Sequence, residues 1–398
     1  MSASGLSAAR LGRMRDVLAG HVDRGGIPGL VALVARRGEV HVVALGTTEA
    51  GGSEPVRRDT IFRIASVTKQ VAAAAAMTLV EECRLRLPDP VDDLLPELAG
   101  RRVLRRPGGP LDDTVPADRP ITLMDLLTFR MGIGAVLAAP GASPIGRAMD
   151  EAGLAPGPLG PSIGPDEWIR RLGGLPLVCQ PGERWMYHTG SDALGVLMAR
   201  ATGQPLADVL AGRIFGPLGM ADTGFCVPEG KLGRLAAAYR PDPAGGLVLT
   251  DDARHGRWSR PPAFPSAGGG LASTADDLLA FCTMMLNKGR HGGDRILSRP
   301  SVELMTTDQL TERQKAENEL FFGGNSGWGL GFQVFLRRTS LASVPGRFGW
   351  TGGTGTSVYT DPAEGLIGIL LTQREMTSPG PPAVFRDFWT CAYQAIDD

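Results

Sequence analysis

Two side chains suited to nucleophilic catalysis stand three residues apart in Ser66-Val67-Thr68-Lys69. This S-x-x-K spacing places both side chains on one face of a helix. A serine hydroxyl is a weak nucleophile, and a neutral amine within reach can accept its proton. The positive end of a helix favours an alkoxide at Ser66, and burial lowers the pKa of a lysine, which favours a neutral amine at Lys69. We therefore predict a serine nucleophile activated by a lysine.

Lysine is rare in this chain, because only four of its 41 basic residues are lysines. A chance Ser-Lys pair is the alternative interpretation of the motif. An unpaired ammonium in so apolar a helix would be costly to bury, however. The composition therefore favours a functional lysine at position 69.

Two further segments could complete such a site. Tyr187 follows the turn-forming Pro181-Gly182, and it could exchange protons with the nucleophile if a nearby ammonium depressed its pKa. The residues alone favour a partly buried aromatic ring with a satisfied hydroxyl. The glycines of segment 349–355 would let backbone N–H groups approach a ligand and form half of an oxyanion hole. An ordinary glycine-rich turn fits that segment equally well.

Other candidate groups are weaker. The segment 160–164 matches G-x-S-x-G around Ser162, but a nucleophile elbow needs a preceding strand, and the flanks here are rich in Pro and Gly. The five histidines lack metal-ligand spacing, so we expect no metal. His188, beside Tyr187, could line the site, although a solvent-facing turn residue is the simpler interpretation.

Hydrophobic periodicity predicts the elements that would position these residues. Helices are predicted over 7–24, 65–82, 122–130, 192–202, 204–215, 275–287 and 382–396. Strands are predicted over 30–35, 40–45, 331–336, 355–360 and 366–372. The first two strands form a hairpin around Arg37-Gly38-Glu39. The stretch 136–166 has little periodicity and is predicted to be a long functional loop, such as a lid or a pocket wall.

Strands at both ends around a helical middle predict an α/β (α+β) fold. We expect an antiparallel sheet flanked by helices and built from both termini, with a mainly helical inserted domain. Residues 1–85 and 290–398 would form the sheet domain, and residues 86–289 the helical domain. The active site would lie between the two.

Composition limits the classes of partner. The chain has 398 residues, 43% of them hydrophobic, and a formal net charge of -1, so electrostatics gives no reason to expect nucleic acid or a membrane as partner. Its five cysteines lack C-x-x-C spacing, which disfavours a disulfide framework. No apolar signal region begins the chain, and its longest apolar run is too short to cross a bilayer. We therefore expect a cytoplasmic protein.

Taken together, these motifs resemble the serine β-lactamase and penicillin-binding-protein superfamily on its class C side. The likeness is closer still to the family VIII carboxylesterases and related acyltransferases. It is carried by the nucleophile block Phe62 to Lys69 and by the blocks Leu126-Leu127-Thr128, Pro217-Leu218-Gly219-Met220 and Gly269-Gly270-Leu271-Ala272-Ser273-Thr274.

The resemblance implies a role for each catalytic position. Ser66 would be the acyl-accepting nucleophile, and Lys69 would accept its proton. Tyr187 would be the proton shuttle that opens the family's Y-x-N element. The backbone N–H groups of Ser66 and Gly353 would form the oxyanion hole.

Departures from the family pattern bear on the substrate. The Y-x-N element reads Tyr187-His188-Thr189, so its asparagine amide is absent, and the family's L-L-T-H-T-S-G has Phe129 in place of its histidine. The third motif, K-T-G or H-x-G, reads Trp350-Thr351-Gly352. An indole cannot supply the cation that helps hold a β-lactam carboxylate, so the resemblance implies neutral, partly apolar substrates. The expected substrate-binding residues are Trp350, Thr351, Gly352, Trp185, His188 and Phe129.

We therefore predict a serine hydrolase that cleaves small-molecule carboxylic esters through a Ser66 acyl-enzyme, without a cofactor. The sequence leaves open whether Lys69 or Tyr187 is the base in each step. Several alternatives also stay open: an acyltransferase, amidase or peptidase using the same acyl-enzyme, a weak β-lactamase side activity, or a catalytically silent ligand-binding homologue. The oligomeric state does not follow from these residues.

Overall fold

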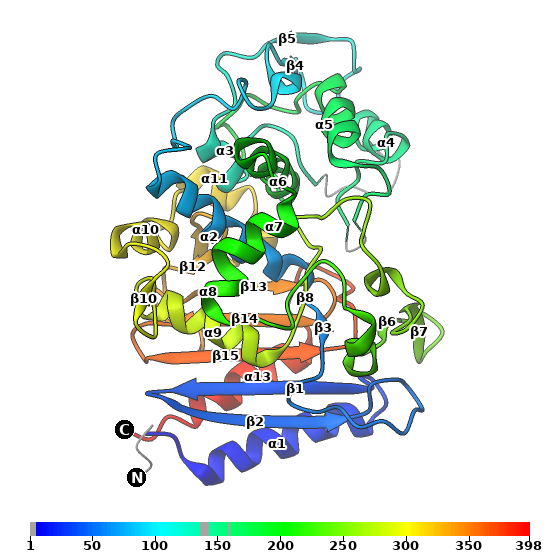
Figure 1. Cartoon of the computed structure of the whole chain (residues 1–398), viewed down its shortest axis with the longest axis vertical. Coiled ribbons are helices and arrows are strands. Elements are labelled where there is room, and N and C mark those ends of the chain that lie inside the picture. The colour runs from blue at the N-terminus through cyan, green and yellow to red at the C-terminus, as the bar shows by residue number, and fades with distance from the viewer. Residues whose placement is uncertain (1–4, 136–142, 158–159) are drawn as a thin grey trace.

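The computed structural model describes residues 5–135, 143–157 and 160–398. Its largest element is a seven-stranded antiparallel sheet in the order β11-β12-β13-β14-β15-β1-β2 (Figure 1). The strands are β1 (Gly29–Arg36), β2 (Glu39–Gly46), β11 (Ser326–Trp328), β12 (Gln333–Phe335), β13 (Phe348–Gly352), β14 (Thr356–Asp361) and β15 (Leu366–Thr372). The predicted sheet from both ends of the chain is confirmed.

Both faces of this sheet are covered, which is why every residue of β1 is buried. Successive side chains of a strand point to opposite faces. Leu30, Ala32 and Val34 face the layer formed by α1 (Ala8–Asp23) and α13 (Ala383–Gln394). Val31, Leu33 and Ala35 belong to the larger core that contains α2 (Thr68–Glu81). The sheet is therefore the middle of three layers (Figure 1).

The rest of the chain is mainly helical, with short strand pairs at its edges (Figure 1). The remaining helices are α3 (Leu123–Leu127), α4 (Pro144–Glu151), α5 (Pro165–Gly174), α6 (Thr189–Thr202), α7 (Leu206–Leu210), α8 (Gly216–Leu218), α9 (Ala275–Leu286), α10 (Arg299–Met305), α11 (Glu312–Ala316) and α12 (Glu319–Phe322). The short strands are β3 (Phe62–Arg63), β4 (Arg102–Leu104), β5 (Thr114–Pro116), β6 (Ala238–Pro241), β7 (Leu247–Asp251), β8 (Ala272–Ser273), β9 (Arg290–His291) and β10 (Asp294–Arg295).

The predicted division into two domains remains a prediction. Helix α9 falls within the range assigned to the helical domain, yet it packs against β14 and β15 of the sheet. Its inner face carries Leu278, Phe281 and Met285, all buried in the larger core. The chain therefore returns to the sheet before the predicted boundary at residue 290.

Several predicted elements differ from the structure. The predicted long loop contains α4, which begins at Pro144 after the N-cap Ser143 and buries Ile145 and Met149. These two residues are four apart and share one helical face, a short signal that the surrounding Gly, Ala and Pro obscured. Residues 136–142 and 158–159 of that stretch lie outside the described residues. Segment 204–215 is α7 followed by a π-helical turn, Ala211–Phe215.

None of the helices in the described ranges combines the length and hydropathy needed to span a bilayer. In the same ranges, no group of three or more His, Cys, Asp or Glu side chains is arranged to hold a metal ion.

Candidate active site

Ser66 lies in a 3-10 turn, Ala65–Val67, that leads directly into α2. The preceding residue, Ala65, has a φ of 42°, a left-handed conformation that costs free energy for a residue with a Cβ. Ser66 is only partly buried, whereas the α2 residues Thr68 to Leu79 are all buried. The turn thus presents the hydroxyl at the end of a rigid, buried helix.

Lys69 lies one helical turn further along. Its side chain is 1% exposed, and its Nζ lies 3.0 Å from Ser66 Oγ, so the two groups meet as their spacing predicts. Burial lowers the pKa of Lys69 to about 7, although the negative charge of Asp192 raises it in part. A substantial fraction of this amine is therefore neutral near pH 7 and able to accept a proton.

Tyr187 completes the group around the nucleophile. Its hydroxyl accepts a hydrogen bond of 2.6 Å from Trp350 Nε1, and Ser66 lies close enough to lower the pKa of Tyr187 in part. Lys69 Nζ lies 4.7 Å from the centre of the Tyr187 ring. Burial raises the pKa of Tyr187 by more than Ser66 and Trp350 lower it. The depressed pKa expected from the sequence is therefore not found, and the phenol stays protonated.

Aromatic side chains hold the Tyr187 ring in place. The rings of Phe129 and Trp185 each lie 5.6 Å from it, centre to centre. Both residues are buried, with exposures of 1% and 3%, in a cluster that also contains Trp328 and Trp350. The contacts seen for Phe129 and Trp185 are with this cluster, and their predicted contact with substrate stays a prediction.

His188 is buried, with 8% exposure, so the interpretation as a solvent-facing turn residue is wrong. Its backbone, with φ 80° and ψ -64°, is the centre of a γ-turn closed by the Thr189 N–H donating to the Tyr187 carbonyl at 3.2 Å. This γ-turn conformation is rare and strained. It turns the imidazole inward, where Nδ1 lies 3.2 Å from Lys69 Nζ. Direct contact of His188 with substrate stays a prediction.

Sequence reasoning missed the groups beneath His188. Its Nε2 lies 3.1 Å from Asp192 Oδ2, and Asp192 also accepts hydrogen bonds from Ser266 Oγ at 2.7 Å and the Gly268 N–H at 2.9 Å. The Gly268 carbonyl in turn accepts from Lys69 Nζ. A His and an Asp four residues apart at the start of a helix were the available signal. The sequence around Gly268 gave no such signal.

Thr189 stands where the family's Y-x-N element has its asparagine. Its buried Oγ1 has no hydrogen-bond partner among the described residues. Contact with the lysine comes from the His188 imidazole instead.

The end of β13 is fastened to the chain just before the nucleophile. Thr354 Oγ1 donates a 2.6 Å hydrogen bond to the Arg63 carbonyl, and Thr356 Oγ1 donates to the Ile64 carbonyl at 3.1 Å. Gly352 packs so closely that an added Cβ would overlap the Ile64 carbonyl oxygen. The sequence left half of an oxyanion hole and an ordinary turn equally open here, and β13 packs against the Ser66 turn. The backbone oxyanion hole at Ser66 and Gly353 remains a prediction.

This close approach predicts opposite outcomes for two neighbouring glycines. Gly352→Ala forces β13 away from the nucleophile turn, and we expect kcat/KM for an ester to fall about 100-fold, as for a misplacement of about 1 Å. Gly353→Ala keeps the backbone N–H, and among the described residues no atom lies within 4 Å of its added Cβ. We expect that variant to stay within about threefold of wild type. Equal kcat/KM values for the two purified variants would contradict this account.

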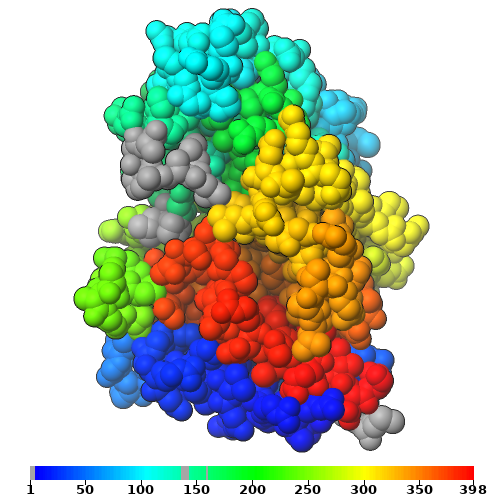
Figure 2. All heavy atoms as spheres, turned by 180° about the vertical axis from the view of Figure 1, so that it is seen from behind, coloured from blue at the N-terminus to red at the C-terminus, as the bar shows by residue number. Residues whose placement is uncertain are grey.

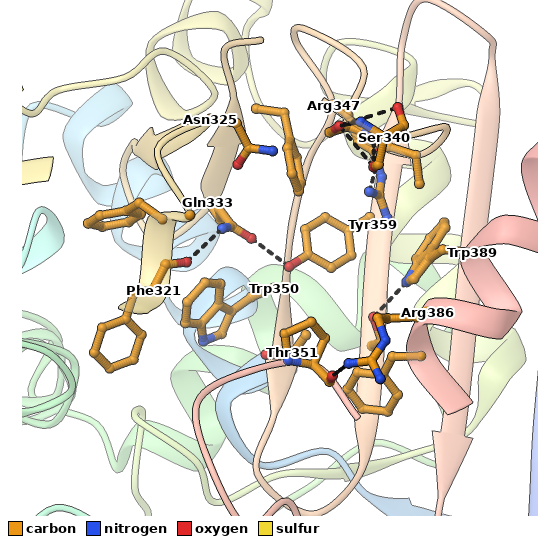
Figure 3. Close-up of a pocket in the computed structure, with 18 of the residues that line it drawn as sticks. Phe321, Asn325, Gln333, Ser340, Arg347, Trp350, Thr351, Tyr359, Arg386 and Trp389 are labelled. Atoms are coloured by element: carbon orange, nitrogen blue, oxygen red, sulfur yellow. Dashed lines mark hydrogen bonds between the residues drawn. The ribbon is translucent and has the colours of Figure 1, made fainter. Parts of the chain in front are cut away.

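A cavity of about 420 Å³ lies on the α13 side of β13. Figure 2 shows the corresponding hollow where the yellow-to-orange segments meet the red C-terminal segment. Trp350 and Thr351 of β13 form one side of it, and Arg386 and Trp389 of α13 the opposite side (Figure 3). Trp350 therefore separates Tyr187 from this cavity. Trp350 and Thr351 were among the predicted substrate-binding residues.

Ser162, the alternative nucleophile, is exposed in a bend before α5, and neither Gly160 nor Pro161 before it belongs to a strand. The context required of a nucleophile elbow is therefore missing.

Comparison with known proteins assigns the family. The model of the Beta-lactamase family matches residues 14–385. Protein Rv1367c of Mycobacterium tuberculosis is 40% identical over 359 residues, covering 88% of this chain and 87% of that protein. Esterase EstB of Burkholderia gladioli is 34% identical over 363 residues, covering 86% of this chain and 85% of EstB.

Solved structures agree. The structure of EstCE1 has a TM-score of 0.80 and 26% identity, and the alignment covers 98% of this chain and 99% of that one. The chain therefore belongs to the Beta-lactamase family, and the resemblance inferred from the motifs is confirmed.

Proposed function

We propose that this protein is a serine esterase that forms an acyl-enzyme on Ser66. The observation that supports this most is a partly exposed serine hydroxyl 3.0 Å from a buried lysine amine whose pKa is about 7. The names of two relatives point the same way: Esterase EstB and, at 29% identity, the Lovastatin esterase of Penicillium rubens.

The geometry favours Lys69 as the base for acylation, because the phenol of Tyr187 stays protonated. Ser66 Oγ attacks the ester carbonyl carbon as its proton moves to Lys69 Nζ. The oxyanion is held by the backbone N–H groups of Ser66 and Gly353. On collapse, the carbon–oxygen bond to the alcohol breaks, and Tyr187 donates the proton that the leaving oxygen needs. Water then releases the acid by the reverse sequence.

The third motif supports neutral substrates. Trp350 carries no charge, and its N–H is already donated to Tyr187, so this position has neither a cation nor a spare donor for a substrate carboxylate. The rings next to Tyr187, which belong to Phe129, Trp185 and Phe321, are apolar as well. We therefore propose esters with an apolar group as substrates and only slow turnover of β-lactams. Efficient hydrolysis of a cephalosporin would contradict this assignment.

Acyl transfer is the second candidate function. EstCE1 is described as a hydrolase with promiscuous acyltransferase activity, and the acyltransferase calJ of Penicillium decumbens is 24% identical over 373 residues. Both reactions share the acyl-enzyme and differ only in whether water or another nucleophile attacks it. Product analysis with a competing alcohol or amine separates them, because a transferase forms ester or amide in preference to acid.

Trapping the intermediate tests the proposed function. We expect a fluorophosphonate to add once to the folded protein and peptide mapping to place the adduct on Ser66, because only that serine is activated by the Lys69 amine. We also expect steady release of p-nitrophenol from a short-chain p-nitrophenyl ester. Heat-denatured protein is the control for labelling. No adduct and no turnover would favour a silent binding protein, and an adduct on another serine would overturn the assignment of Ser66.

A further inference from the structure

We propose that Asp192 fixes the tautomer of His188 and, through it, aims the lone pair of Lys69 at Ser66. This inference rests on the proposed function, because it explains how the base of that reaction is oriented. Asp192 and His188 would then be positioning residues that act through the lysine. The donors and acceptors along one buried chain of side chains fix the direction of each of its hydrogen bonds.

At one end of this chain lies Asp192, a buried carboxylate that can only accept hydrogen bonds. Burial raises the pKa of Asp192, but hydrogen bonds from His188, Ser266 and Gly268 together lower it by more, so it lies below the usual value. His188 Nε2 must therefore carry the hydrogen that it shares with Asp192. Burial and the neighbouring lysine both lower the pKa of His188, so the imidazole is neutral. Its Nδ1 then holds a lone pair and is an acceptor.

Lys69 comes next. A neutral amine has two N–H bonds and one lone pair. Its neighbours include two groups that can only accept, His188 Nδ1 at 3.2 Å and the Gly268 carbonyl. These two acceptors use both N–H bonds. The lone pair is left for the third neighbour, Ser66 Oγ, at 3.0 Å, which can donate its proton to it.

The groups on the other side of Ser66, Tyr187 and Trp350, are consistent with this direction of hydrogen bonding. The indole of Trp350 can only donate, and it donates to the Tyr187 oxygen. The Tyr187 hydrogen is therefore free to point toward Ser66, which lies close enough to affect the pKa of Tyr187. From Ser66 to Asp192 the hydrogen bonds run in one direction, and the serine proton lies on the side of the lysine.

Backbone strain supports a role for His188 beyond packing. A positive φ is uncommon for a residue other than glycine, and strained residues persist where the surrounding structure holds them, often at functional sites. Here the conformation at His188 is what places an imidazole between Lys69 and Asp192.

The decisive variant is Asp192→Asn. The Gly268 N–H can only donate to this side chain, so the amide oxygen takes that position and the amide NH2 faces His188 Nε2. The imidazole must then protonate Nδ1 and donate to Lys69, which draws the lone pair away from Ser66. We expect kcat/KM to fall about 100-fold or more with KM nearly unchanged, as expected when a histidine takes the wrong tautomer.

The pH profile distinguishes orientation from charge. The groups that act on Lys69 and His188 are each other, Asp192 and Tyr187. Removing only the negative charge of Asp192 would lower the pKa of Lys69, so the acid limb of kcat/KM would move to lower pH with an unchanged plateau. Loss of orientation lowers the plateau itself.

Asp277→Asn in α9 is the matched control. It removes another buried carboxylate, which accepts from the Asp222 N–H and Thr223 Oγ1, and its kcat/KM should stay within about twofold of wild type.

A second substitution should rescue the first. His188→Asn supplies an amide oxygen near the place of Nδ1, where it accepts from Lys69 whatever residue 192 is, and asparagine tolerates positive φ better than most residues. We expect the double variant His188→Asn/Asp192→Asn to be at least about tenfold more active than Asp192→Asn alone. A double variant no better than the single one, or an unchanged plateau in Asp192→Asn, would overturn the inference.

Nitrogen-15 NMR of the imidazole gives a readout that does not depend on activity. We expect the His188 signal, assigned by its loss in His188→Asn, to show a protonated Nε2 in wild type and a protonated Nδ1 in Asp192→Asn. If the protein proves not to be an esterase, the proposed function fails and this measurement still decides the tautomer. A protonated Nδ1 in wild type would refute the inference even in an active esterase.

Discussion

Replacing Ser66 with alanine will lower kcat for a p-nitrophenyl ester by about 10⁴-fold or more, because the substitution removes the only atom that can form the acyl-enzyme. Ser66 Oγ lies 3.0 Å from Lys69 Nζ, so its removal leaves this amine without the hydroxyl that it would activate. The hydroxyl is partly exposed, and its loss should change thermal stability little. The measurement is steady-state turnover together with circular dichroism of both proteins.

Ser162→Ala is the matched control for this experiment. Ser162 lies in a G-x-S-x-G segment but is exposed in a bend, and its replacement should leave kcat within about twofold of wild type. Equal turnover by wild type and folded Ser66→Ala would show that another nucleophile carries the reaction. Loss of turnover in Ser162→Ala with retention in Ser66→Ala would reverse the assignment.

Replacing Lys69 with methionine will lower kcat/KM by about 10³-fold or more, because it removes the amine, 3.0 Å from Ser66 Oγ, that we propose takes the serine proton. In wild type, kcat/KM should rise with pH through about 7, the pKa to which burial brings Lys69, since only the neutral amine accepts a proton. Lys69→Arg should also be inactive, because a guanidinium stays charged throughout this range. A wild-type profile that is flat between pH 6 and 8 would contradict Lys69 as the base.

Although Lys69 is needed for activity, its burial should lower the stability of the folded protein near neutral pH. Its folded pKa of about 7 lies below the ordinary lysine value of 10.5, so the unfolded chain binds more protons between these values. The free energy of unfolding of wild type should therefore rise with pH over that range. Lys69→Met removes this contribution. We expect its Tm at pH 7 to be no lower than that of wild type and the Tm advantage over wild type to shrink toward pH 9.5. A collapse of Tm in Lys69→Met would mean that unfolding explains the lost activity.

Local relations along the chain could be read from the sequence. The S-x-x-K spacing placed Ser66 and Lys69 together because residues three apart share a helical face. Alternating apolar runs around a Gly turn predicted the β1–β2 hairpin, and the predicted strand 366–372 coincides with β15. Two elements were hidden by composition: α4 lies among Gly, Ala and Pro, and β13 lies in a motif whose glycines suggested a turn or an oxyanion hole rather than a strand.

The sequence by itself therefore determined the family, and it predicted the nucleophile and its neighbouring lysine. The tertiary structure alone decided how these groups are oriented. Lys69 and Gly268 are 199 residues apart, and Tyr187 and Trp350 are 163 apart, so their hydrogen bonds depend on how helices and sheet pack rather than on local spacing. His188 is buried only because a γ-turn directs its ring inward. Donor and acceptor roles could be inferred only from the folded structure, which places the donor Trp350 on one side of Ser66 and the acceptor Asp192 on the other.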